Sequence, residues 1–303
     1  MGQTLSPLRY PGGKTRLSNF VEHIIIKNGL LGGHYAEPYA GGAGIAWKLL
    51  FNKYVSHVYI NDINRSVHAF WWSVLNQPDE LCRLIQDTKV SIEEWHRQKK
   101  VQADPNADPL SLGFSTFFLN RTNRSGIVWA GVIGGKKQDG LYKLDARFNK
   151  KNLVPRIQKI AGYKEMISLS NLDALVFIKS QIPLLPEKTL IYFDPPYYKK
   201  GAGLYENHYQ HDDHQKVAIA VSDVSHKWIV SYDNVPEISD MYSVYPKITY
   251  DLTYSAADRY SGSEAMFFSP GLLIPDGGPI TNLVQCKVSQ SNQTLQTARL
   301  LLE

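Results

Sequence analysis

The sequence contains little cysteine and no long apolar run. Cys82 and Cys286 are the only cysteines among 303 residues, too few for a disulfide framework or a four-cysteine zinc site. No stretch approaches the roughly 20 apolar residues that span a bilayer. The N-terminus lacks the basic start and apolar core of a secretory signal. We therefore expect a protein of the reducing cytoplasm with no membrane segment and, at 43% hydrophobic residues, an ordinary globular core.

The net charge of +5 is also small, but it is unevenly distributed. Residues 112–164 carry eleven Lys and Arg residues against two Asp, whereas the rest of the chain has 22 basic and 26 acidic residues. Aromatic residues and glycines are interspersed in this basic segment (residues 112–164). Such a composition is typical of a surface that binds a polyanion such as nucleic acid. A solvated face of a helical domain is the alternative.

The first part of the chain alternates between strand and helix patterns. Apolar spacing predicts helices over Arg16–Leu30 and Ala43–Phe51, and strands over His34–Tyr39 and Ser56–Ile60. A glycine-rich turn follows the first strand, and an acid follows the second. This order is that of one mononucleotide-binding half of a doubly wound α/β sheet.

The pattern becomes helical from about residue 64 to residue 120, and the glycine-rich part of the basic segment follows. Strand character then returns at Met166–Leu169, Thr189–Phe193, Lys227–Ser231, Tyr242–Tyr245 and Ala265–Phe268. We therefore predict a discontinuous catalytic domain (1–63 and 165–275), a helical and loop insertion (64–164) and a C-terminal tail (276–303).

The turn Glu37–Gly44 contains three glycines between a strand and a helix. Small residues allow backbone amides to approach a ligand at a helix N-terminus, although a purely structural turn looks the same. Asp62 lies about 20 residues further on, where a carboxylate accepts ribose hydroxyls in nucleoside-binding folds. The alternative role for Asp62 is a cap for the helix that starts near Asn64. Together the turn and the acid favour a nucleoside cofactor.

The tetrapeptide Asp194–Tyr197 (Asp-Pro-Pro-Tyr) ends an apolar strand, so it lies at the carboxyl edge of the sheet, where ligands bind. Two prolines stiffen it and remove two backbone donors. The Asp194 carboxylate and the Pro195 carbonyl can both accept hydrogen bonds from one exocyclic amino group, and Tyr197 offers a ring for stacking. This arrangement suits methylation of an aromatic amine. A proline-rich strand exit with a capping Asp is the alternative.

Four separated motifs occur in a recognisable order: Leu8–Lys14, Glu37–Gly44, Asn61–Asp62 and Asp194–Tyr197. Together with the basic segment, they resemble the adenine-specific DNA methyltransferases of the Dam-like D12 class over roughly residues 5 to 270. The resemblance implies an α/β fold: a Rossmann-like class I S-adenosylmethionine-dependent methyltransferase core with a mostly helical inserted DNA-recognition domain.

The resemblance also implies three sets of site residues. The catalytic set is Asp194, Pro195, Pro196, Tyr197 and Lys14. The cofactor-binding set is Tyr10, Lys14, Glu37, Pro38, Tyr39, Gly41, Gly42, Ala43, Gly44, Asp62, Ile63, Ser170, Asn171 and Asp194. The DNA-binding set is Asn120, Arg121, Asn123, Arg124, Lys136, Lys137 and Arg259. Arg259 and Glu264 resemble a late hairpin near the DNA, but an exposed ion pair is equally consistent with them.

The implied reaction moves the methyl group of S-adenosylmethionine to N6 of an adenine flipped out of duplex DNA. It requires no metal, because the sulfonium is already an activated electrophile. His208, His211 and His214 are close in sequence but have poor zinc-binding spacing, so we expect ordinary residues before and on a helix. Double-stranded DNA is the expected partner, and a monomer the expected state.

Two other functions remain open at this point. The same fold serves RNA and protein-amide methyltransferases, although related enzymes with those substrates carry Asn where this chain has Asp194. A non-catalytic DNA-binding protein on this scaffold is the other. Residues 128–137 depart from the segment of members that read GATC, so the sequence predicts no recognition site. A link to restriction-modification is expected from the family.

Overall fold

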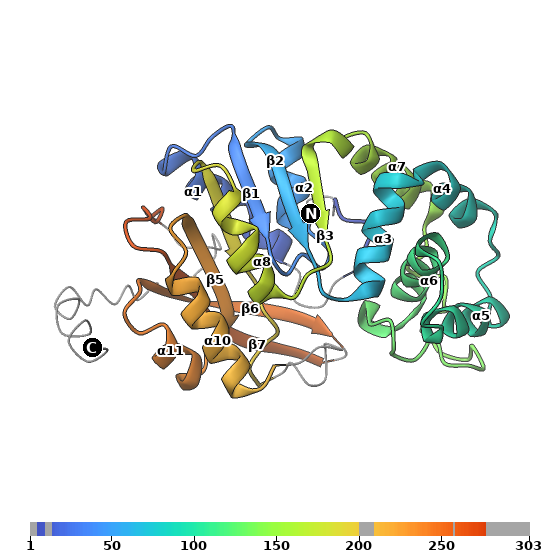
Figure 1. Ribbon diagram of the computed structural model, residues 1–303. Helices are drawn as coiled ribbons and strands as arrows, with labels where there is room; N and C mark the ends of the chain where they lie inside the picture. Colours follow the sequence, from blue (N-terminus) through green and yellow to red (C-terminus); the bar gives the residue numbers. More distant parts are fainter. Residues whose placement is uncertain (1–4, 10–13, 200–208, 257, 277–303) are drawn as a thin grey trace. The chain divides into compact units, whose positions relative to one another are not determined.

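The computed structural model describes residues 5–9, 14–199, 209–256 and 258–276. Seven strands form a mixed sheet in the order β3-β2-β1-β4-β5-β7-β6. They are β1 (Gly33–Glu37), β2 (Val55–Asn61), β3 (Ile167–Ser170), β4 (Thr189–Phe193), β5 (Lys227–Asp233), β6 (Lys247–Ala256) and β7 (Asp258–Phe268) (Figure 1). The expected α/β fold of Rossmann type is confirmed.

Helices connect most of the strands. They are η1 (Lys14–Leu17), α1 (Ser18–Lys27), α2 (Gly44–Phe51), α3 (Arg65–Asn76), α4 (Pro78–Asp87), α5 (Ile92–Ala103), α6 (Pro109–Thr122), η2 (Arg124–Gly126), α7 (Lys150–Ala161), η3 (Lys164–Met166), α8 (Ala174–Ser180), η4 (Ile182–Leu184), α10 (His211–Ser222) and α11 (Pro236–Met241). None of the helices in the described ranges is long and apolar enough to cross a membrane.

The chain divides into two compact units. Unit 1 comprises Met1–Thr15, Ala40–Asn52 and His57–Asp173, and unit 2 comprises Arg16–Tyr39, Lys53–Ser56 and Ala174–Glu303. Unit 1 therefore takes in the glycine-rich turn, most of β2 and all of β3 in addition to the predicted insertion.

Unit 2 is built around β4, whose five residues are all buried. β4 pairs in parallel with β1 and β5, so Ile191 lies between Ala36 and Trp228. β7 then runs antiparallel to β5 and to β6. A strand buried on both faces reads as a continuous apolar run, which explains why the sequence predicts Thr189–Phe193 with the correct ends.

The predicted strand Tyr242–Tyr245 is wrong. This segment forms the turn after α11, and β6 begins only at Lys247. Tyr242 is fully buried and its ring stacks on Phe267 with 4.9 Å between centroids. The apolar character of the segment therefore comes from a turn that packs on the sheet and not from a strand within it.

Unit 1 holds five consecutive helices, α3 to α7, coloured from blue-teal to green in Figure 1. Side chains of Asn64, Ser91 and Asp108 cap the N-termini of α3, α5 and α6. α6 packs closely on α3 at Gly113, where an added Cβ would lie 2.6 Å from the Ala69 carbonyl oxygen. The structure forms helices in the stretch from about residue 64 to residue 120, as the periodicity predicts.

Candidate active site and DNA interface

The glycine loop (residues 40–44) leads into α2 in unit 1. Gly41 has φ 47°, and Ala43, the residue before α2, has φ 48°. A left-handed Ala is uncommon and carries a strain that the surroundings must hold in place. Two buried indoles hold the turn in place: Trp71 donates to the Gly41 carbonyl (2.8 Å), and Trp47 donates to the Gly42 carbonyl (3.2 Å). The loop is therefore preorganised at a helix N-terminus.

Asp62 is buried directly beside this loop. Its Oδ2 accepts a hydrogen bond from the Gly41 amide (2.8 Å), and its Oδ1 accepts from the Asn64 amide (2.9 Å). Asn64 itself caps α3, so the capping alternative for Asp62 does not apply. Burial raises the pKa of Asp62 to about 6, although both amide contacts oppose the shift. Asp62 thus fixes the geometry between the end of β2 and the glycine loop.

Ser170 and Asn171 lie at the end of β3 and bind the protein's own chain. The Asn171 side-chain amide donates to the carbonyls of Asp62 (2.6 Å) and Ile63 (3.1 Å). Ser170 donates to the Asn61 side chain (2.8 Å). Ile63 is 45% exposed. The structure therefore gives Ser170 and Asn171 a role in holding the Asp62–Ile63 turn.

In unit 2, β4 is followed by residues 194–199, which we name the catalytic loop because the sequence predicts that role for them. Asp194 is partly exposed, and its Oδ1 accepts a hydrogen bond from the Ser231 hydroxyl (2.7 Å). Ser231 lies on the neighbouring strand β5 and in turn accepts from the Tyr192 hydroxyl (3.1 Å). The chain Tyr192–Ser231–Asp194 fixes the rotation of the Asp194 carboxylate.

Tyr197, the last residue of the tetrapeptide, is anchored by an acid on β7. Its hydroxyl donates to Glu264 Oε1 (2.5 Å), and the Tyr250 hydroxyl donates to Glu264 Oε2 (2.8 Å). Tyr197 is 3% exposed and Glu264 is 1% exposed. The interpretation of Glu264 as part of an exposed ion pair is therefore wrong, because this acid is buried and holds the catalytic loop.

Asp233, at the end of β5, fixes the far side of the catalytic loop. Its two carboxylate oxygens accept from the consecutive amides of Tyr198 (2.9 Å) and Lys199 (3.0 Å). Sequence reasoning missed Ser231, Asp233 and the anchoring role of Glu264. The position of Ser231 and Asp233 at the carboxyl end of a strand parallel to β4 is the signal that points to them.

The other residues predicted to bind the cofactor differ in their hydrogen bonds and burial. Glu37 Oε1 accepts from the Tyr35 hydroxyl (3.0 Å), and the Tyr39 and Tyr209 hydroxyls share a hydrogen bond (3.2 Å). Pro38 is buried, as is Lys14 in η1. Tyr10 lies outside the described residues.

The two described histidines of the cluster, His211 and His214, bind aromatic hydroxyls. His211 Nδ1 shares a hydrogen bond with the Tyr198 hydroxyl (2.8 Å), and His214 Nδ1 shares one with the Tyr232 hydroxyl (3.0 Å). His208 lies outside the described residues. Within the residues that the structure describes, no group of three or more potential metal ligands occurs.

Three predicted DNA contacts are buried in unit 1. Asn120 pairs with both backbone groups of Arg9 (2.8 and 2.6 Å) and also donates to the Gly126 carbonyl (2.8 Å). Arg121 donates from two nitrogens to the Pro7 carbonyl, and Asn123 accepts from the Trp95 indole (2.6 Å). These side chains position the protein's own chain, so the structure does not present Asn120, Arg121 and Asn123 to a ligand.

The basic segment carries uncompensated positive charge. Among the residues that the structure describes, none of its eleven Lys and Arg side chains forms an ion pair. Burial and the neighbouring charges of Arg9, Arg156 and Arg147 lower the pKa of Arg121 to about 9. Arg124, Lys136 and Lys137 are exposed. Arg259 lies on β7, but its side chain is outside the described part of the structure. Such a surface suits a polyanion.

Comparison with known proteins gives the family. Residues 10–255 match the model of the D12 class N6 adenine-specific DNA methyltransferases. The type II methyltransferase M.MjaIII of Methanocaldococcus jannaschii is 26% identical over 210 residues, which are 63% of this chain and 68% of that protein.

The modification methylase StsI of Streptococcus sanguinis is 25% identical over 210 residues, again 63% of this chain but only 28% of its own length. The solved rRNA methyltransferase aviRa of Streptomyces viridochromogenes is 11% identical, with a TM-score of 0.37 and 86% of each chain covered. The family model spans most of the chain and includes the glycine loop, Asp62 and the catalytic loop. The chain therefore belongs to the D12 class of N6 adenine-specific DNA methyltransferases.

Proposed function

We propose that this protein methylates N6 of adenine at a specific sequence in double-stranded DNA, acting as a monomer on an adenine rotated out of the helix. The observation that carries the proposal is the setting of Asp194. It stands at the end of a buried parallel strand, and its carboxylate is oriented by Ser231. An oriented acceptor at this edge of the sheet suits an exocyclic amino group.

We propose S-adenosylmethionine as the cofactor, held by Asp62 and the glycine loop. The residues fit this group: a buried carboxylate for ribose hydroxyls, a strained turn of small residues at a helix N-terminus, and the exposed Ile63 beside them. When bound, S-adenosylmethionine supplies a methyl group on a sulfonium, which needs no further activation. Asp62 and the amides of the loop bind and orient the cofactor.

At the catalytic loop, Asp194 and the Pro195 carbonyl accept hydrogen bonds from the two N6 hydrogens of the adenine. This pairing draws electron density toward the nitrogen lone pair, which is otherwise delocalised into the ring. A bound S-adenosylmethionine would supply the methyl carbon that N6 accepts, the electrons of the broken carbon–sulfur bond would stay on sulfur, and the N6 proton would go to solvent. Glu264 and Asp233 hold the loop so that these acceptors keep their positions.

We propose that the basic segment binds the DNA backbone. With Asn120, Arg121 and Asn123 buried, the exposed side chains of Arg124, Lys136 and Lys137 are the candidates for direct contact, together with Arg259. Lys and Arg side chains that neutralise phosphates release counterions, so the affinity for DNA should fall steeply as salt is raised.

The decisive experiment incubates the protein with duplex DNA and methyl-labelled cofactor, then digests the DNA to nucleosides. Label is expected in N6-methyladenine alone, with RNA and protein samples unlabelled. Label in cytosine, or no label with any adenine-containing duplex, contradicts the proposal. Tight duplex binding without saturable cofactor binding would instead indicate a non-catalytic DNA-binding protein.

The affinity for the cofactor is expected to depend on pH through Asp62. A carboxylate accepts two ribose hydroxyls only when it is ionised, and the pKa of Asp62 is about 6. Affinity should therefore be constant above about pH 7 and fall about tenfold by pH 5, since each pH unit below the pKa is worth about 1.4 kcal/mol. Calorimetric titration with S-adenosylhomocysteine from pH 5 to pH 8 measures this.

The matched variant is Asp62→Asn, which keeps the shape of the side chain but does not titrate. It should bind S-adenosylhomocysteine weakly and with the same affinity throughout this pH range. A wild-type affinity that is equal at pH 5 and pH 7 would show that Asp62 is not the titrating ligand.

A further inference from the structure

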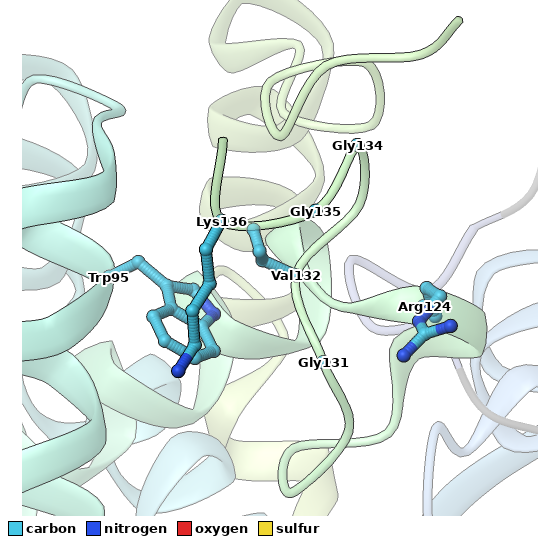
Figure 2. Close-up of a pocket in the computed structure, with 7 residues that line it drawn as sticks. All are labelled: Trp95, Arg124, Gly131, Val132, Gly134, Gly135 and Lys136. Carbon is cyan, nitrogen blue, oxygen red and sulfur yellow. The ribbon is translucent and has the colours of Figure 1, made fainter. Parts of the chain in front are cut away.

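The basic segment contains a pocket that the proposed reaction does not use. It has a volume of about 430 Å³ and lies between α5 and residues 124–136 (Figure 2). Trp95 and Val132, which are 5% and 3% exposed, form its apolar floor. Three glycines contribute bare backbone to its wall. This volume lies within the range of small-ligand sites and suits a group of about the size of a nucleoside.

Two cations line the same pocket. Figure 2 shows the Arg124 and Lys136 side chains on either side of the backbone that runs from Gly131 to Gly135. Both are exposed, and within the described ranges neither forms an ion pair. Lys99 adds a third positive charge nearby, 5.6 Å from the centre of the Trp95 ring and 5.1 Å from that of Trp129. Figure 2 places Lys136 on the Trp95 side of this backbone and Arg124 on the other side, so the pocket offers cations at two separate positions beside its apolar floor.

The walls of the pocket are fixed before any ligand binds. The Trp95 indole donates to Asn123 (2.6 Å), and the Arg124 amide donates to the Gly131 carbonyl (3.0 Å). Asn123 and Val132 form an antiparallel bridge between these two contacts. A ligand therefore meets a preorganised surface and loses less free energy to ordering.

We propose that this Trp95 pocket binds one nucleotide of a DNA strand, with its base or sugar on the Trp95–Val132 floor and its two flanking phosphates at Arg124 and Lys136. The proposal rests on the proposed function as a DNA methyltransferase. A nucleotide within a strand has a phosphate on each side, whereas a free mononucleotide carries phosphate on one side only. Two separate cations in one pocket thus favour a strand.

Three variants separate the shape of the pocket from its charge. Gly131→Ala keeps every charge, but the added Cβ would lie 2.8 Å from Arg124 Nη2, so the flexible guanidinium must move. Lys136→Ala removes a pocket cation. Lys100→Ala removes an identical exposed charge from α5, outside the pocket lining, and is the matched control.

The probes are the mononucleotide dAMP and a single-stranded pentanucleotide of adenine, titrated into ¹⁵N-labelled protein. We expect saturable shifts of the Trp95 indole NH and the Gly131 amide. Since stacking and phosphate contacts add along a strand, the pentanucleotide should bind about tenfold more tightly than dAMP. Equal affinities would overturn the assignment to a strand, and absence of shifts with both probes would overturn the site.

Binding of the pentanucleotide should weaken about tenfold in Gly131→Ala and in Lys136→Ala but less than about threefold in Lys100→Ala. Equal losses of affinity in the two lysine variants would show that Lys136 contributes only general electrostatic attraction and would overturn its role in the pocket. Methyl transfer by the wild type provides the separate check. Transfer without pocket shifts overturns this inference alone, whereas pocket shifts without transfer to any DNA overturn the proposed function alone.

Discussion

Replacement of Asp194 by Ala is expected to reduce the single-turnover rate of methyl transfer by about a thousandfold, because removal of one oriented group at a reacting centre costs about 10²- to 10³-fold. Asp194 is expected to accept a hydrogen bond from the reacting amino group, and Ser231 fixes its rotation. The rate is measured with saturating DNA and S-adenosylmethionine. Affinity for S-adenosylhomocysteine should change little, since we expect Asp62 and the glycine loop to carry most of that binding.

The control for Asp194→Ala is Ser231→Ala, which leaves the carboxylate in place but removes the hydroxyl that orients it. Its rate should fall only about tenfold, the effect of losing one hydrogen bond of about 1 kcal/mol with some misorientation. If Asp194→Ala retained more than about a tenth of the wild-type rate, its carboxylate would not be the acceptor that this mechanism requires.

Replacement of Glu264 by Ala should be the most destabilising of these substitutions. The acid is 1% exposed and accepts the hydroxyls of Tyr197 and Tyr250. Each buried hydroxyl left without an acceptor costs about 1–3 kcal/mol, so the free energy of unfolding should fall by about 2–6 kcal/mol. Urea denaturation measures the loss. Methyl transfer should fall as well, because Tyr197 is no longer held.

Two milder changes bracket this result. Tyr250→Phe removes one donor and leaves the bond from Tyr197 to Glu264, so it should cost about 1 kcal/mol and preserve most activity. Glu264→Gln keeps the size of the side chain and one acceptor oxygen. Its loss in free energy of unfolding should lie between those of Tyr250→Phe and Glu264→Ala. A Glu264→Ala protein as stable as Tyr250→Phe would show that the acid does not anchor the loop.

The elements that the sequence predicts well are those with a strong local pattern. The apolar run Thr189–Phe193 has only one reading, and glycines with a following acid identify the first nucleoside-binding half. Helices α3 to α6 occupy the stretch from about residue 64 to residue 120 where the sequence has a helical period. The order of the motifs gives the family because each motif is local and distinctive.

The residues that the sequence misplaced have partners far along the chain. Ser231 is 37 positions from Asp194, Glu264 is 67 from Tyr197, and Asn120 is 111 from Arg9. No local pattern distinguishes a buried acid that anchors a loop from an exposed acid that pairs with a neighbour. The resemblance places Asn120 in the DNA-binding set, yet its side-chain amide binds the backbone of Arg9 and Gly126.

The pairing of Asn120 with Arg9 has a consequence for exchanging specificity between relatives. The side-chain amide donates to and accepts from one backbone residue, as a neighbouring strand would, and it also donates to the Gly126 carbonyl. These hydrogen bonds join the backbone at Arg9 to the backbone at Gly126 in the basic segment. A chimaera that receives residues 64–164 alone would pair its new Asn120 region with a foreign segment at residues 5–9. Residues 5–9 should therefore be exchanged together with residues 64–164.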